Sequence, residues 1–209
     1  MKNKHLFLSV NIFLSLVVLP IRSEVKLPCF INNGMVLQRD IEVPVWGWAS
    51  VGEKIQIEFN GATYNTVTGE DRKWKIKLNP SKAGGPYQIA VKGNNTIILK
   101  DILIGDVWFC SGQSNMEFEM KKVVDKYAKE IESSENNKIR QIVITRKPLF
   151  NATPDVETYA GWQSANPQTV LKFTAVGYFY AKELYEKYKI PIAYQLINYV
   201  IIKQKPHIY

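Results

Sequence analysis

The sequence contains few of the residues that most often reveal a protein's chemistry. Among its 209 residues there are two histidines and two cysteines. Cys29 and Cys110 could pair in an oxidising compartment, and a buried free thiol at Cys110 is the favoured alternative. The composition is not that of a collagen, a coiled coil or a long disordered chain. These exclusions, together with the length, indicate a globular protein of one or two domains.

The sequence also has no uninterrupted apolar run of the roughly 20 residues that usually span a bilayer. Residues 1–23 instead combine Lys2 and Lys4, a short apolar stretch and a small residue, Ser23. This layout is typical of a secretory signal peptide. We therefore expect a secreted, periplasmic or lysosomal protein with no membrane span after the signal is cleaved.

A large basic patch is missing as well. Removing residues 1–23 removes three basic residues and no acidic one, so the net charge falls from +8 to +5. The remaining basic residues are scattered, as where Lys73, Lys75 and Lys77 alternate with apolar neighbours. No expected helix carries a basic stripe, so binding to nucleic acid is not expected.

Residues 24–102 show the two-residue period of β-strands. Apolar and polar residues alternate in 55–59, 74–78 and 87–91, and Asn60-Gly61 predicts a two-residue hairpin turn after the first of these segments. Turn residues recur about every ten positions, which predicts an antiparallel β-sandwich. Trp46 and Trp48 are expected to pack in it, with an aromatic platform for a sugar as the alternative.

The pattern changes in residues 103–209, which we expect to form a second domain. Residues 104–110 predict a buried strand, 120–131 an amphipathic helix, 139–145 a second strand, and 190–202 a third. A further helix is expected to pack through one face made of Val176, Phe179, Tyr180, Leu184 and Tyr188. Strands that alternate with helices predict a parallel sheet covered by helices.

The turn after residue 110 holds the candidate catalytic residue. Parallel sheets bind ligands at the carboxyl ends of their strands, and Ser114 follows such a strand. Backbone N–H groups near it could stabilise the oxyanion of an ester undergoing attack, and Gly112 would permit a tight turn. The alternative is that Ser114 only caps the following helix.

The segment GDVWFCSGQSNM (residues 105–116) closely resembles a block of the sialate O-acetylesterases, a branch of the SGNH hydrolases. Three further segments are similar to that family in the same order: residues 33–49, residues 83–87 and residues 173–184. The resemblance implies a β-sandwich followed by a partial α/β domain with a flavodoxin-like parallel sheet. It implies a carbohydrate esterase that removes O-acetyl groups from sialic acids or related sugars.

In this family resemblance Ser114 matches the nucleophile, and its backbone N–H would be an oxyanion donor. Gly112, Gln113 and Asn115 match the motif in supporting roles. The implied chemistry uses no metal and no organic cofactor.

The chain departs from the family pattern where the catalytic base is expected. The family's histidine lies in an Asp-x-x-His setting, whereas Gln204 precedes His207 by three residues and His5 lies in the signal peptide. No glycine follows Gly177, so residues 193–209 lack the expected Gly-Gly turn. We therefore expect a truncated esterase, ended by a frameshift, a split gene or an incomplete gene model. The alternative function is that of a catalytically inactive fragment or glycan-binding remnant.

Overall fold

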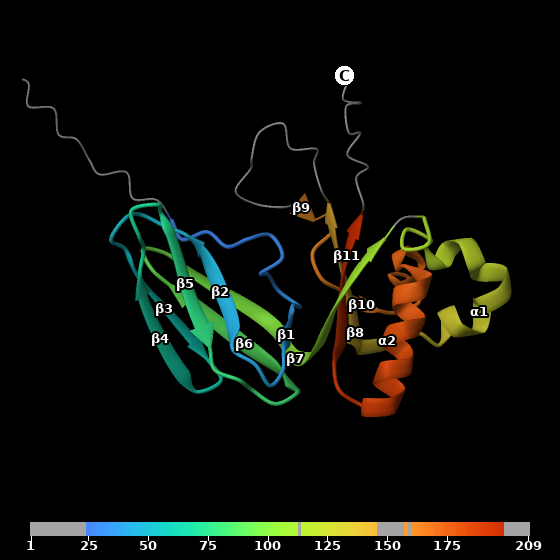
Figure 1. The fold of residues 1–209 in the computed structure, drawn as a ribbon. Coiled ribbons are helices and arrows are strands. Elements are labelled where there is room, and N and C mark those ends of the chain that lie inside the picture. The colour runs from blue at the N-terminus through green and yellow to red at the C-terminus, as the bar shows by residue number, and fades with distance from the viewer. Residues whose placement is uncertain (1–23, 113, 146–156, 159, 199–209) are drawn as a thin grey trace, which may run out of the picture.

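The computed structural model describes residues 24–112, 114–145, 157–158 and 160–198 (Figure 1). The expected signal peptide, Gln113, His5 and His207 lie outside these residues. Mixed parallel and antiparallel pairing joins nine strands into one sheet, and two further strands form a small sheet. The strands of the first half are β1 (Val36–Gln38), β2 (Val43–Trp48), β3 (Lys54–Phe59), β4 (Ala62–Val67), β5 (Lys73–Leu78), β6 (Gly84–Lys92) and β7 (Thr96–Gly112).

The antiparallel strands of the first half follow the alternation in the sequence. β3 and β4 form the expected hairpin, with Asn60 and Gly61 both at positive φ (49° and 77°), as a type I′ turn requires. β5 pairs with β2 in the small sheet, and its alternate residues Trp74, Ile76 and Leu78 are buried. Their side chains join those of the large sheet in one apolar core.

β7 is a single 17-residue strand that belongs to both halves of the molecule. From Thr96 to Ile104 it pairs antiparallel with β6, and from Asp106 to Gly112 it pairs parallel with β11 (Ile192–Asn198). β11 in turn pairs parallel with β8 (Asn136–Thr145). The change of architecture expected after residue 102 thus occurs inside one continuous strand (Figure 1).

The parallel half of β7 is not buried as expected. Trp108 is 41% exposed and Phe109 is 65% exposed. Among the described residues, this half of the strand has a strand neighbour on one side only, β11. Side chains of an edge strand have fewer neighbours than those of a central strand. The apolar composition of the segment does not reveal that it is an edge strand, so it did not predict this exposure.

Two helical segments accompany the parallel strands. The first is helical over residues 120–132 as expected, but it divides into a short 3₁₀ helix, η1 (Met120–Val123), and α1 (Val124–Glu132), which Tyr127 interrupts with φ −123°. The second, α2 (Ala175–Tyr188), packs on β11 and β8. The remaining elements are β9 (Glu157–Thr158), β10 (Gln163–Ala165) and the 3₁₀ helix η2 (Val170–Lys172).

The buried face of α2 agrees with the predicted one only in part: Phe179 and Leu184 pack against the second core as expected. Gly177, Tyr178 and Ala181 are buried, whereas Val176, Tyr180 and Tyr188 are largely exposed. Gly177 is required at this contact, because a Cβ atom there would lie 2.7 Å from Cε2 of Tyr194 on β11. Apolar residues surround most of this helix, so its sequence alone did not fix the face that packs.

A second, smaller core lies between the helices and the parallel strands. Arg140 of β8 connects this region to the antiparallel half: its Nη1 donates to the carbonyls of Gly34 and Asp101 (2.6 and 2.7 Å), and Nη2 pairs with Oδ1 of Asp101 (2.9 Å). Cys110 is a half-buried free thiol, so it forms no disulfide with Cys29, and burial raises its pKa. Within the described part of the chain, no helix has the length and apolar character needed to cross a membrane.

Candidate functional site

The candidate site lies where the parallel strands end. β7, β11 and β8 point the same way, with Gly112 beside Asn198 in the strand register, so their carboxyl ends meet at one edge of the sheet (Figure 1). Ser114 lies in the turn that directly follows β7, and its side chain is exposed. A hydroxyl at this position can reach a ligand at the edge where parallel sheets bind them.

Two of the three predicted supporting residues are described: Gly112 ends β7 and Asn115 lies in the turn. The carbonyl of Asn115 accepts a hydrogen bond from the backbone N–H of Phe118 (3.4 Å), which closes the turn. A Cβ atom on Gly112 would lie 2.8 Å from Cγ of Met116, so glycine allows the chain to fold back closely. Gln113 matches the motif but lies outside the described residues.

A cavity of about 860 Å³ adjoins the turn. The turn contributes Met116 and Glu117 to its wall, and the carboxyl-terminal halves of β8 and β11 contribute Val143 and Leu196. Thr174, at the start of α2, lies on the same wall. The volume is within the range of small-molecule sites.

The turn is anchored to α2 by backbone hydrogen bonds. The N–H of Ala175 donates to the carbonyl of Phe118 (2.8 Å), and the N–H of Met120 donates to the carbonyl of Phe173 (2.9 Å). Met120 is fully buried. The Ser114 turn is therefore fixed at its far end by a short β-bridge to the N-terminus of α2.

Gln141 was not found from the sequence, although it holds this bridge in place. Its side chain is 3% exposed, and its Oε1 accepts from the backbone N–H of Thr174 (3.0 Å) while Nε2 donates to the carbonyl of Lys172 (3.4 Å). The sequence signal for this role was an amide side chain next to the apolar residues of β8. A buried polar group needs a partner, so this residue had to bond to a neighbouring element.

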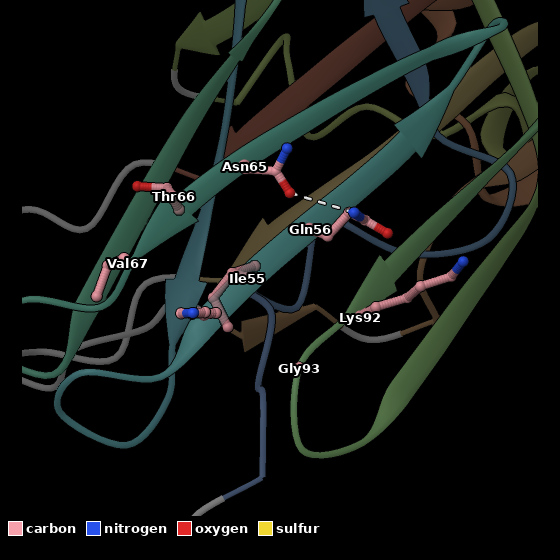
Figure 2. A pocket seen from close by; sticks show the side chains of 8 residues that line it. Ile55, Gln56, Asn65, Thr66, Val67, Lys92 and Gly93 are labelled. Carbon is pink, nitrogen blue, oxygen red and sulfur yellow. Dashed lines mark hydrogen bonds between the residues drawn. The ribbon is translucent and has the colours of Figure 1, made fainter.

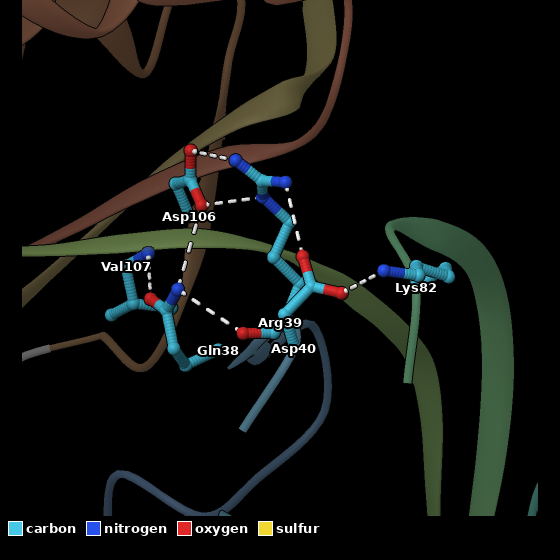
Figure 3. A network of polar contacts seen from close by, with 6 residues as sticks. All are labelled: Gln38, Arg39, Asp40, Lys82, Asp106 and Val107. Atoms are coloured by element: carbon cyan, nitrogen blue, oxygen red, sulfur yellow. Dashed lines mark hydrogen bonds and ion pairs between the residues drawn. The ribbon is translucent and has the colours of Figure 1, made fainter. Parts of the chain in front are cut away.

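A second polar network joins the β1 segment to β7. The Arg39 guanidinium binds the Asp106 carboxylate twice, at 2.7 Å through Nε and at 3.2 Å through Nη2 (Figure 3). Gln38 accepts from the N–H of Val107 (2.8 Å). Lys82 donates a hydrogen bond that lowers the pKa of Asp40, and the Asp106 carboxylate raises the pKa of Arg39. These contacts lie at the amino end of the parallel half, so they position β7 rather than line the cavity.

Other hollows lie on the antiparallel half, away from Ser114. One, of about 560 Å³, lies on β3, β4 and the end of β6, where Gln56 Nε2 donates to Asn65 Oδ1 (3.2 Å) (Figure 2). Another, of about 580 Å³, lies at β2 and β5. Within the described ranges, no three His, Cys, Asp or Glu side chains are grouped closely enough to hold a metal ion.

Part of this chain is similar to known proteins. No family model matches it. It is 32% identical over 106 residues to "Sialate O-acetylesterase" of Homo sapiens and of Rattus norvegicus, which covers 45% of this chain and 20% of each relative.

A solved structure gives a longer match. It is a carbohydrate acetylesterase from Xanthomonas citri, with a TM-score of 0.79 and 32% identity over 84% of this chain and 40% of that one. The mixed multi-stranded sheet thus matches the fold of a carbohydrate acetylesterase. These similarities confirm the resemblance that the motifs indicate: the chain is similar to sialate O-acetylesterases and to a carbohydrate acetylesterase over part of their length.

Proposed function

We propose that this chain is a carbohydrate esterase of the sialate O-acetylesterase type, with Ser114 as its nucleophile. The observation that carries the proposal is the position of Ser114, exposed in the turn after a parallel strand, where Met116 and Glu117 of the same turn line the 860 Å³ cavity. The similarity to a carbohydrate acetylesterase over 84% of the chain supports it. The substrate would be an acetylated sugar, such as an O-acetylated sialic acid.

In this proposal Oγ of Ser114 attacks the acetyl carbonyl carbon while a base removes the hydroxyl proton. The tetrahedral oxyanion is stabilised by the backbone N–H of Ser114. It collapses as the sugar oxygen leaves with a proton, and water then hydrolyses the acetyl-enzyme to acetate and free serine. Gly112 keeps the turn compact, and Asn115 and Gln113 support it.

Hydrolysis of p-nitrophenyl acetate, together with labelling by a fluorophosphonate probe, tests the nucleophile. We expect Ser114→Ala to abolish labelling and to lower the rate at least tenfold, to the non-enzymatic background. Ser111→Ala is the matched control, because Ser111 is an exposed serine three residues away on β7. Equal rates and labelling in the parent and both variants would exclude Ser114 as the nucleophile.

The alternative is a glycan-binding protein without turnover. It is favoured by one observation: the part of the chain that the structure describes contains no histidine, the usual base for serine. A protein that binds an O-acetylated sialic acid in titration calorimetry, but neither hydrolyses it nor reacts with the fluorophosphonate, would support this alternative over the esterase.

We further propose the organisation of the chain. Residues 1–23 would be the signal peptide of a secreted, periplasmic or lysosomal protein, residues 24–102 the β-sandwich, and residues 103–209 an SGNH-type domain. The antiparallel and parallel halves of β7 support this division. Mass spectrometry of the exported protein should find Glu24 at its N-terminus; a mature protein that retains residues 1–23 would contradict the assignment.

A further inference from the structure

The outer face of the small sheet carries two tryptophans. Along β2, Val45 and Gly47 are buried, whereas Pro44 is exposed and Trp46 and Trp48 are only partly buried. Successive side chains of a strand point to opposite faces, so these last three residues share the outer face. The two indole rings meet edge to face, with centroids 5.2 Å apart. We call Pro44, Trp46 and Trp48 the tryptophan strip.

Lysines flank this strip on both sides. Trp46 is opposite Lys75 and Trp48 is opposite Lys73 in the pairing of β2 with β5, and Lys26 is bridged to Trp48 from the other side. Directly paired residues of antiparallel strands project from the same face. All three lysines are exposed, so this face of the small sheet presents ammonium groups as well as aromatic rings.

The charge of these lysines is only partly balanced nearby, because Asp71 lines the same hollow as Lys73 and Lys75. Lys77, opposite Pro44, is neutralised by an ion pair with Glu42 at 2.8 Å. By contrast, none of the carboxylates in the described ranges forms an ion pair with the three flanking lysines. The surface of the small sheet is therefore both aromatic and cationic.

A hollow of about 580 Å³ extends from this surface. Its lining includes Pro44, Trp46, Lys73, Lys75 and one acidic residue, Asp71, and also Trp74 from the buried face of β5. The indole Nε1 of Trp74 is buried and has no hydrogen-bond partner among the described residues. Because this N–H group is buried in the core, it is closed to a ligand in the hollow and contributes nothing to binding there.

We propose that the tryptophan strip and its flanking lysines bind an anionic polysaccharide. Indole rings offer flat apolar surface to the C–H faces of sugar rings, and ammonium groups form charge-assisted hydrogen bonds with carboxylates. Two adjacent indoles favour a chain of sugars over a single one. This site lies on the antiparallel half, is separate from Ser114, and does not depend on the proposed esterase activity.

Affinity electrophoresis and titration calorimetry with hyaluronan, polygalacturonate and polysialic acid test this site. We expect the full chain to bind at least one of them, more weakly as salt is raised, and not to bind neutral dextran. Trp46 also packs against the core and against Phe30, so Trp48 is the better residue to change. Trp48→Ala should weaken binding at least tenfold, and Trp48→Phe should retain most of it.

Three variants control for unfolding and for the catalytic site. Lys73→Gln with Lys75→Gln changes only exposed side chains, and it should reduce affinity at least fivefold and flatten the salt dependence. Trp108→Ala, a partly exposed tryptophan of the parallel half, and Ser114→Ala should bind like the parent. The proposal is overturned if no anionic polysaccharide binds, if dextran or single-stranded DNA binds equally well, or if the lysine variant keeps full affinity.

Discussion

Oε1 of Gln141 accepts a hydrogen bond from the backbone N–H of Thr174 at 3.0 Å, and both residues are buried. This contact fixes the start of α2 to β8. The start of α2 in turn holds the segment that follows Ser114, through the bonds of Met120 and Ala175. The position of the candidate nucleophile thus depends on Gln141, which is 33 residues from its partner Thr174 in the sequence.

Gln141→Ala should destabilise the protein by about 1–3 kcal/mol, because it leaves the buried N–H of Thr174 without an acceptor. For a chain of this size that corresponds to a fall in Tm of several degrees. Thermal unfolding followed by circular dichroism measures it. Gln56→Ala is the matched control, since the bond from Gln56 to Asn65 is exposed and its loss should change Tm little. An equal Tm for both variants would contradict the role of Gln141.

Two buried tyrosines should respond oppositely to loss of the hydroxyl. The Tyr194 hydroxyl is buried without a hydrogen-bond partner in the described structure, whereas the Tyr178 hydroxyl donates to Oε1 of Glu130 (2.8 Å). Tyr194→Phe should therefore stabilise the protein by about 1 kcal/mol, and Tyr178→Phe should destabilise it by about 1–2 kcal/mol. Urea denaturation compares the two; a change of the same sign in both would be inconsistent with these environments.

The same tyrosines predict a loss of stability in alkali. Burial raises the pKa of Tyr194, and burial together with the bond to Glu130 raises the pKa of Tyr178. The folded protein holds both protons more tightly than the unfolded chain does. The free energy of unfolding is therefore unaffected by the titration of these two hydroxyls below the unfolded pKa of about 10. It falls as pH rises above that value, because the unfolded chain then loses these protons first. Urea unfolding between pH 8 and 11.5 should show this fall, and the Tyr178→Phe, Tyr194→Phe double variant should show a smaller one.

Gly112→Ala should displace the Ser114 turn, because the added methyl would lie 2.8 Å from Cγ of Met116. We expect fluorophosphonate labelling of Ser114 to fall severalfold with little change in Tm. The double variant Gly112→Ala, Met116→Ala provides the control, since Cβ of Met116 would then be the nearest side-chain atom, at 3.4 Å. Labelling should recover in it. Unchanged labelling in the single variant would show that this close approach does not position the turn.

Local sequence rules correctly predicted the elements whose structure depends only on residues close together in the sequence. Asn60-Gly61 adopts positive φ at both positions and closes its hairpin as expected. Trp74, Ile76 and Leu78 alternate with lysines and are buried as expected. In such segments the side-chain period and the turn residues carry enough information to define the local structure.

The packing of the parallel half could not be predicted in the same way. α2 buries Tyr178 rather than Val176 or Tyr180 because Gly177 lets Tyr194 approach. Trp108 and Phe109 are exposed because of the position of β7 at the edge of the described parallel strands. Gln141 was missed for the same reason: its partner, Thr174, belongs to another element. Each of these features depends on which elements pack together. The apolar periodicity of a single segment does not contain that information.

The continuity of β7 has a consequence for how the molecule loses its structure. The strand contributes Ile102, Leu103 and Ile104 to the first core, and Cys110 packs against the second. At the junction, Gly105 passes so close to the carbonyl of Pro191 that a Cβ atom would lie 2.0 Å from it. Unfolding of β7 would therefore remove packing contacts from both cores at once. The two halves should behave as one cooperative unit, and hydrogen exchange should protect the β6–β7 and β7–β11 amides to a similar degree.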